Sequence, residues 1–171
     1  MNDPNPIMHV ALDNNRDIAA EVGILLSCYA IIELHMFVVF SKITGSNRDE
    51  SEVILGNVSG FFSKMNILKK LLSNNTDPSI DKGYAMRILE SVDKCNRIRN
   101  KYAHSVYSQI SIKGETKWRT SSWLGDARRN NKFEYFDLDS IRKECEILRQ
   151  SIRDLNYFGN LELPGPDGAG P

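Results

Sequence analysis

The chain has little cysteine, and its three cysteines are too far apart to form a familiar metal or disulfide motif. Cys28, Cys95 and Cys145 are the only cysteines in 171 residues. No CxxC pair and no Cys/His cluster with zinc-ligand spacing occurs. Each cysteine falls on an apolar helical stripe. We therefore predict reduced core thiols in a cytoplasmic protein, with no metal site and no cofactor.

The chain also lacks a net charge, since 22 Lys+Arg balance 22 Asp+Glu. Its charge is nevertheless uneven: ten basic and two acidic residues lie between Lys94 and Lys132, so this window carries +8 and the remainder −8. A neutral chain with one basic region is typical of a protein that binds a polyanion at one place. The alternative interpretation is a solvated basic loop.

No apolar run is long enough to predict a membrane span. The segment from Val22 to Phe40 is very apolar, but Glu33 and His35 interrupt it, and the uncharged run that ends at Ile32 has eleven residues. A span needs about 20 apolar residues. The N-terminal "MNDPNPIMH" also lacks the basic and apolar regions of a secretory signal. We predict a central helix buried on most sides, and no membrane partner.

Helical periodicity accounts for most of the chain. Apolar residues recur at steps of three and four in four long segments, and "SNRDESEVIL" has the cap and acidic first turn of a short helix. Asp77 followed by Pro78 predicts a helix start, and Asp139 predicts another. The expected helices run from about Asp17 to Gly45, from Ser46 or Asn47 to Leu55, from Phe61 to Leu72, from Asp77 to His104, and from Asp139 to Gly159.

A change of pattern follows His104. "VYSQISI", "ETKWRTSSW" and "KFEYFDL" are rich in β-branched and aromatic residues, which favours a hairpin with a third strand. The fold class is therefore mainly α: a helical bundle of four to five helices with a small β-hairpin insertion. The predicted organisation is an N-terminal tail over 1–14, one domain over 15–158 with the insertion at about 106–136, and a disordered Pro/Gly-rich tail over 159–171.

The stretch "RIRNKYAHSVY", from Arg97 to Tyr107, combines an apolar helical register with charged residues. The apolar stripe of the preceding helix, extended at the same spacing, reaches Arg99. An arginine on the apolar side of a helix is unusual unless its charge is needed there. The stripe consists of Ala85, Ile88, Val92 and Cys95, and continues at Arg99 and Tyr102.

Arg99 and His104 do not share a face of an ideal helix. Five residues apart, they point about 140° away from each other, whereas Asn100 and His104, four apart, share a face. Two arrangements would bring the arginine and histidine together. Either the helix ends or distorts before His104, or a second copy contributes its own pair across a two-fold axis.

Arginine, asparagine and histidine without metal ligands suit the transesterification of RNA. A guanidinium binds phosphate in a bidentate manner, and an imidazole titrates near neutral pH as a general acid or base. Such a site would use the 2′-hydroxyl as nucleophile and leave a 2′,3′-cyclic phosphate, and DNA would be inert.

"RNKYAH" resembles the signature of the HEPN superfamily: an arginine, a polar residue, a few variable positions and a histidine at the end of a long helix. The resemblance implies a helical bundle that dimerises with its motif helices at the interface. Many members are metal-independent endoribonucleases of toxin–antitoxin and other defence systems. It also implies that Arg99 binds phosphate, Asn100 modulates the site and His104 is catalytic.

The surrounding residues complete the hypothesis and show one departure. Some toxin members carry a tyrosine two residues past the histidine, which a cognate antitoxin modifies, but here Val106 occupies that position and the tyrosine is Tyr107. The expected partners are RNA, a second copy of the chain, and an antitoxin or other regulatory protein. The residues predicted to contact RNA are Arg97, Lys101, Tyr107, Arg119, Arg128 and Arg129.

Two other classes of function stay open from the sequence. The same fold and dimer would serve as a non-catalytic module in which Arg99 and His104 organise a nucleotide or partner interface. A plain scaffolding domain is the third interpretation, because basic side chains near a helix C-terminus also favour the helix dipole.

Overall fold

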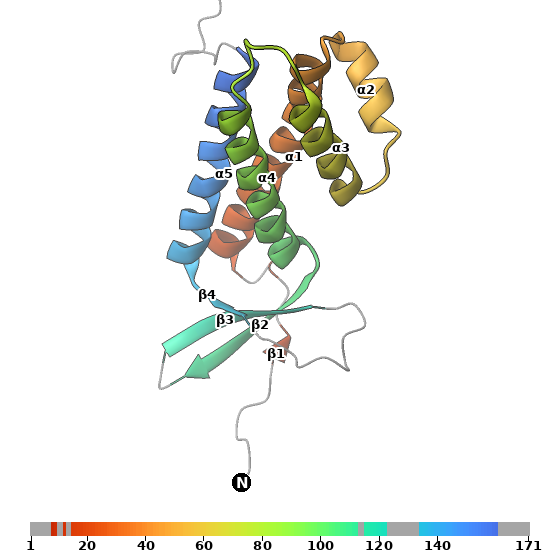
Figure 1. Cartoon of the computed structure of the whole chain (residues 1–171). Coiled ribbons are helices and arrows are strands. Elements are labelled where there is room, and N and C mark those ends of the chain that lie inside the picture. The colour runs from red at the N-terminus through yellow and green to blue at the C-terminus, as the bar shows by residue number, and fades with distance from the viewer. Residues whose placement is uncertain (1–7, 10–11, 13–14, 113–114, 123–133, 161–171) are drawn as a thin grey trace, which may run out of the picture. The chain divides into compact units, whose positions relative to one another are not determined.

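The computed structural model describes residues 8–9, 12, 15–112, 115–122 and 134–160. The chain is mainly helical with one small antiparallel sheet (Figure 1). The predicted bundle of four to five helices with a hairpin after the motif helix is therefore confirmed. The helices are α1 (Arg16–Thr44), α2 (Arg48–Gly56), α3 (Phe61–Asn74), α4 (Lys82–Ala103) and α5 (Leu138–Gly159), and the strands are β1 (Met8–His9), β2 (Ser105–Ile112), β3 (Glu115–Ser122) and β4 (Glu134–Phe136).

The chain divides into two compact units. Unit 1 comprises Met1–Cys28 and Asn96–Ile147, and unit 2 comprises Tyr29–Cys95 and Leu148–Pro171. Unit 1 therefore holds the sheet, the start of α1, the end of α4 and the start of α5. Unit 2 holds the rest of these three helices together with α2 and α3.

The long helix α1 is less covered than its composition predicts. It ends as expected at Gly45, whose φ of 73° suits a residue without a side chain. About a third of its most apolar window is buried, and Ile24, Ile31 and Leu34 are 39, 40 and 53 % exposed. The prediction of a helix buried on most sides is wrong for the described chain. By length and composition alone, α1 is also long and apolar enough to cross a membrane.

Side-chain caps decide where α2, α4 and α5 begin. Asn47 and Glu50 form the reciprocal capping box of α2, in agreement with the sequence. The predicted start of α4 at Asp77 is wrong: Asp77 accepts from the Ser79 N–H in a local turn, and the capping residue is Asp81, four residues later, which accepts from the Tyr84 N–H at 2.9 Å.

The predicted cap of α5 is displaced in the same way. Asp137, not Asp139, accepts from the Ser140 N–H at 2.7 Å, and the Ser140 hydroxyl bonds back to the Asp137 N–H. These bonds from Ser140 hold the pKa of Asp137 below its usual value. Asp139 lies in the first turn, 3.8 Å from the Arg142 guanidinium.

In unit 2, α4 and α5 meet through buried groups. Ser151 of α5 lies 2.6 Å from the Ser91 hydroxyl and accepts from the Cys95 thiol at 3.2 Å. Burial raises the pKa of Cys95. All three cysteines are free; Cys95 and Cys145 are buried and Cys28 is half-buried. The prediction that the cysteines lie in the core is confirmed for Cys95 and Cys145.

In unit 1, the strands form a sheet in the order β1-β2-β3-β4, with antiparallel neighbours. Trp118 of β3 and Phe136 of β4 are paired in register and both are buried. Their sheet face meets the end of α4, where the Tyr102 and Phe136 rings pack edge-on at 5.7 Å. The short strand β1 was expected to be part of a tail; it pairs with Ser108 and Gln109 of β2.

Candidate functional site

The motif occupies the last turn of α4, where the helix meets the sheet in unit 1. The predicted apolar stripe is confirmed: Cys95 and Tyr102 are buried, and Arg99 between them is half-buried. Asn100 and His104 are exposed. The register thus holds the stem of Arg99 among apolar neighbours while the polar groups of the motif stay open to solvent.

The helix ends one residue before the histidine. Because α4 stops at Ala103, His104 stands between the helix and β2, which begins at Ser105. The Arg99 Nη1 lies 3.1 Å from the His104 Nε2. Two arrangements could have brought this pair together. The end of the helix before His104 is enough to do so within one chain.

The contact has a defined polarity. A guanidinium nitrogen only donates, so the His104 Nε2 is the acceptor in this contact. The same Arg99 Nη1 donates to the Asn100 Oδ1 at 2.8 Å. Asn100 therefore orients the guanidinium, and the guanidinium orients the imidazole through its Nε2.

Glu144 of α5 anchors the motif from the other side. It accepts from the buried Tyr102 hydroxyl and from the Lys101 ammonium, the latter at 3.1 Å. Glu134 of β4 lies 3.6 Å from the same ammonium. Two consecutive residues inside "RNKYAH" are thus tied to a neighbouring helix and strand, which fixes the backbone that carries Arg99 and His104.

Tyr107 closes the turn after the histidine. Its hydroxyl donates to the Tyr102 carbonyl at 2.6 Å, and its ring packs edge-on against Phe136 at 6.1 Å. The last carbonyls of a helix have no partner within the helix, so this bond satisfies one of them. His104 consequently lies in a loop that is tied on both sides.

The predicted RNA contacts have different surroundings. Arg97 is exposed on α4, but the ion pairs of Lys101 and the backbone bond of Tyr107 favour structural roles for those two residues. Arg119 lies on β3 between Ser108 of β2 and Tyr135 of β4 in the register of the sheet. The predictions for Arg128 and Arg129 lie outside the described residues.

Sequence reasoning missed both carboxylates of this site. Glu134 and Glu144 lie 30 and more residues beyond the motif, and neither belongs to a recognisable motif of its own. The one available signal was Glu144 beside Cys145 on the predicted seam of the last helix, next to a side chain that had to be buried. Within the described ranges, no group of three or more His, Cys, Asp or Glu side chains is arranged to hold a metal ion.

The tyrosines around the motif predict a loss of stability at alkaline pH. Burial and the bond to Glu144 raise the pKa of Tyr102 above its ordinary value of 10, and burial raises the pKa of Tyr107 to about 12. Both groups stay protonated in the folded chain at a pH where they ionise in the unfolded chain. Their stabilisation is therefore complete below pH 10 and is lost as the pH rises from about 10 towards 12.

Denaturant unfolding at pH 8, 10 and 11 would measure this effect. We expect the free energy of unfolding to fall more steeply with pH in the unmodified chain than in Tyr107→Phe, which has no hydroxyl to ionise. Tyr135→Phe is the matched control, because Tyr135 is 52 % exposed. Equal slopes in the unmodified chain and Tyr107→Phe would contradict the buried tyrosine hydroxyl as a cause.

Comparisons of the chain with protein-family models, with curated proteins and with solved structures gave no match. The functional argument therefore rests on the residues and geometry of the motif and on its resemblance to the HEPN signature.

Proposed function

We propose that this chain is a HEPN-like, metal-independent endoribonuclease that acts as a homodimer, in a toxin–antitoxin or other defence setting. One observation carries the proposal: Arg99 Nη1 lies 3.1 Å from His104 Nε2 at the exposed end of α4. A phosphate ligand and a proton acceptor are thus adjacent, and both belong to the motif. The surplus of basic residues between Lys94 and Lys132 supports a polyanionic substrate.

The proposed step is an internal attack on an RNA phosphate. His104 Nε2 removes the proton of a 2′-hydroxyl, and the 2′-oxygen forms a bond to the adjacent phosphorus while the bond from phosphorus to the 5′-oxygen breaks. The departing 5′-oxygen takes a proton from an acid. Arg99 releases the imidazole and donates to the phosphate oxygens, whose negative charge grows in the transition state. The products are a 2′,3′-cyclic phosphate and a 5′-hydroxyl.

The need for both a base and an acid supports the homodimer. Each protomer offers one imidazole in its motif, and a neutral ring that accepts a proton is not at the same time the acid. A second copy would bring a second His104 to the same phosphate, as the HEPN resemblance implies. A cytoplasmic location and control by an antitoxin or other regulatory protein stay predictions of the same proposal.

Cleavage of matched nucleic acids in EDTA tests the proposal. The purified protein is incubated with a mixed RNA pool, with the same sequences as DNA, and with 2′-O-methyl RNA. We expect cleavage of the RNA alone, with 2′,3′-cyclic phosphate ends. Cleavage of DNA or of 2′-O-methyl RNA, or a complete dependence on added metal, would overturn the mechanism. So would the absence of cleavage by the folded protein.

A non-catalytic binding module is the second candidate, and one observation favours it. The Arg99 guanidinium is already bonded to Asn100 and His104, so in this conformation part of its hydrogen-bonding capacity is used inside the motif. Such a module would bind RNA or a nucleotide without cleaving it. Retention of labelled RNA on the protein without any cyclic phosphate product would support this candidate over the enzyme.

A further inference from the structure

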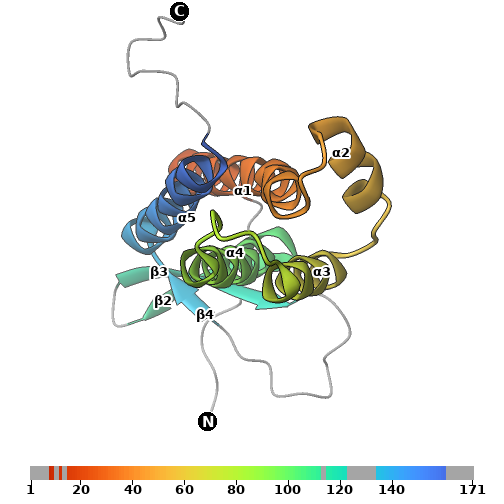
Figure 2. The ribbon, with the colours of Figure 1, turned by 45° about the horizontal axis from the view of Figure 1, so that its top comes forward.

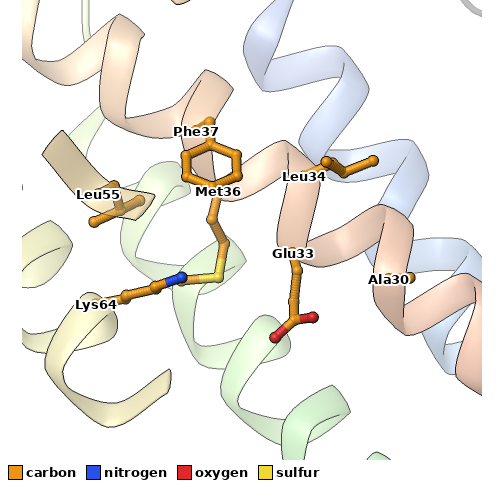
Figure 3. A pocket seen from close by; sticks show the side chains of 7 residues that line it. All are labelled: Ala30, Glu33, Leu34, Met36, Phe37, Leu55 and Lys64. Atoms are coloured by element: carbon orange, nitrogen blue, oxygen red, sulfur yellow. The ribbon is translucent and has the colours of Figure 1, made fainter. Parts of the chain in front are cut away.

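A cavity in unit 2 is lined by three helices and shares no residue with the motif. Its volume is about 410 Å³, and five of its seven lining residues belong to α1, with one each from α2 and α3. Figure 3 shows Glu33 and Leu34 projecting from α1, and Lys64 reaching in from α3. The lining is mostly apolar and comprises Ala30, Glu33, Leu34, Met36, Phe37, Leu55 and Lys64.

Two opposite charges stand at this cavity without pairing. Within the part of the chain that the structure describes, neither the Glu33 carboxylate nor the Lys64 ammonium makes a hydrogen bond or ion pair. The Lys64 ammonium lies instead 5.7 Å from the centre of the Phe37 ring. Glu33 is exposed. The cavity therefore offers one negative and one positive group, on different helices, to whatever covers it.

The apolar surface continues beyond the cavity. Leu34, which lines it, is 53 % exposed, and Ile31, one helical turn earlier on α1, is 40 % exposed. Figures 1 and 2 both show α2 on the outer side of the unit, beside the end of α1 and next to α3. This surface therefore has an exposed leucine that protrudes and, beside it, a recess that could receive an apolar side chain.

We propose that a second copy of this chain docks on this cavity across a two-fold axis. A two-fold axis places the same surface against itself, so every group must meet a complementary group of its own surface. This surface carries one charge of each sign, so Glu33 of each protomer would pair with Lys64 of its partner, giving two equivalent ion pairs. Leu34 of each protomer would lie in the partner's cavity against its accessible apolar lining residues, the exposed Ala30 and the half-buried Phe37.

The observations favour a second copy over a small ligand or an unrelated protein. A small ligand filling the cavity would leave Ile31 exposed to water, whereas a protein surface would cover it. One positive and one negative group together give no net attraction for a strongly charged partner. In a two-fold contact, each of the two groups would meet its opposite on the second copy. The contact uses none of the motif residues, so it is separate from the motif-to-motif dimer of the proposed function.

Charge reversal with a compensating double variant tests this contact. We would measure the mass of the full chain by analytical ultracentrifugation over a range of concentrations. Glu33→Lys and Lys64→Glu each put like charges into both symmetry-related pairs, so each should raise the dissociation constant at least tenfold and halve the mass of the largest assembly. The double variant carries the two charges exchanged, and it should restore the original mass.

A matched pair of apolar substitutions tests the recess. Leu34→Gln should weaken assembly, whereas Ile54→Gln should not, because Ile54 is equally exposed at 53 % but does not line the cavity. Circular dichroism would verify that all variants stay folded.

Three results would overturn the proposal: an unchanged mass in both single charge variants, a double variant that is no better than the singles, or equal effects of Leu34→Gln and Ile54→Gln. A small ligand, a lipid or another protein as the true occupant would produce the first of these. The mass measurement does not depend on RNA cleavage, and the cleavage test does not depend on the mass of the cavity variants. Failure of the proposed function and failure of this contact are therefore distinguishable.

Discussion

Replacing His104 with alanine should reduce metal-free RNA cleavage by about 10²- to 10⁴-fold, the range in which a general acid or base contributes to rate. The substitution removes the proton acceptor whose Nε2 lies 3.1 Å from Arg99 Nη1. If two copies share one site, both imidazoles disappear together, so the loss should lie near the upper end of that range. The quantity to measure is the first-order rate of product formation in EDTA under single-turnover conditions.

A structural role for His104 must be separated from a chemical one. His104 is exposed, so its truncation should change the free energy of unfolding by less than about 0.5 kcal/mol. Addition of free imidazole should restore part of the activity of His104→Ala, because a diffusible base can occupy the space that the side chain leaves. His35→Ala serves as a control for the loss of a histidine in unit 2. Full activity in His104→Ala would rule out the proposed mechanism.

The elements of this fold are predictable where local patterns determine them. Steps of three and four define the helices because a helix that buries one face must repeat its apolar residues at that period. The hairpin after His104 is visible from its β-branched and aromatic residues. Helix starts are less predictable, because Asp77 and Asp81 are both competent caps: Asp77 accepts from Ser79 in a local turn, and Asp81 accepts from Tyr84 in the first turn of the helix.

Long-range contacts account for what the sequence left out. The approach of Arg99 to His104 was one of two arrangements compatible with the spacing, and the end of α4 at Ala103 selects it. The pairing of β1 with β2 was missed because two residues carry no periodic signal. Nothing in one sequence links Tyr102 to a carboxylate 42 residues away, because their contact depends on how α5 packs beside α4 in unit 1.

Replacing Glu144 with alanine should destabilise the chain by about 2 kcal/mol and slow RNA cleavage at the same time. The Tyr102 hydroxyl is buried and would lose its acceptor, and an unsatisfied buried donor costs about 1–3 kcal/mol. Lys101 would lose its 3.1 Å ion pair with Glu144 and keep the longer contact of 3.6 Å to Glu134. Both changes loosen the backbone between Arg99 and His104, and misplacement of reacting groups by about 1 Å can cost roughly 100-fold in rate.

The two other variants of this cluster separate anchoring from general loss of charge. Glu144→Gln keeps an oxygen that accepts from Tyr102 but has no charge for Lys101, so its effects on stability and rate should be intermediate. Glu134→Ala should cost less than about 1 kcal/mol and leave the rate nearly unchanged, because that carboxylate is 60 % exposed and makes the longer contact. Equal effects of Glu134→Ala and Glu144→Ala would show that Glu144 contributes only charge. The expected order therefore makes Glu144 a positioning residue that acts through its hydrogen bond with Tyr102.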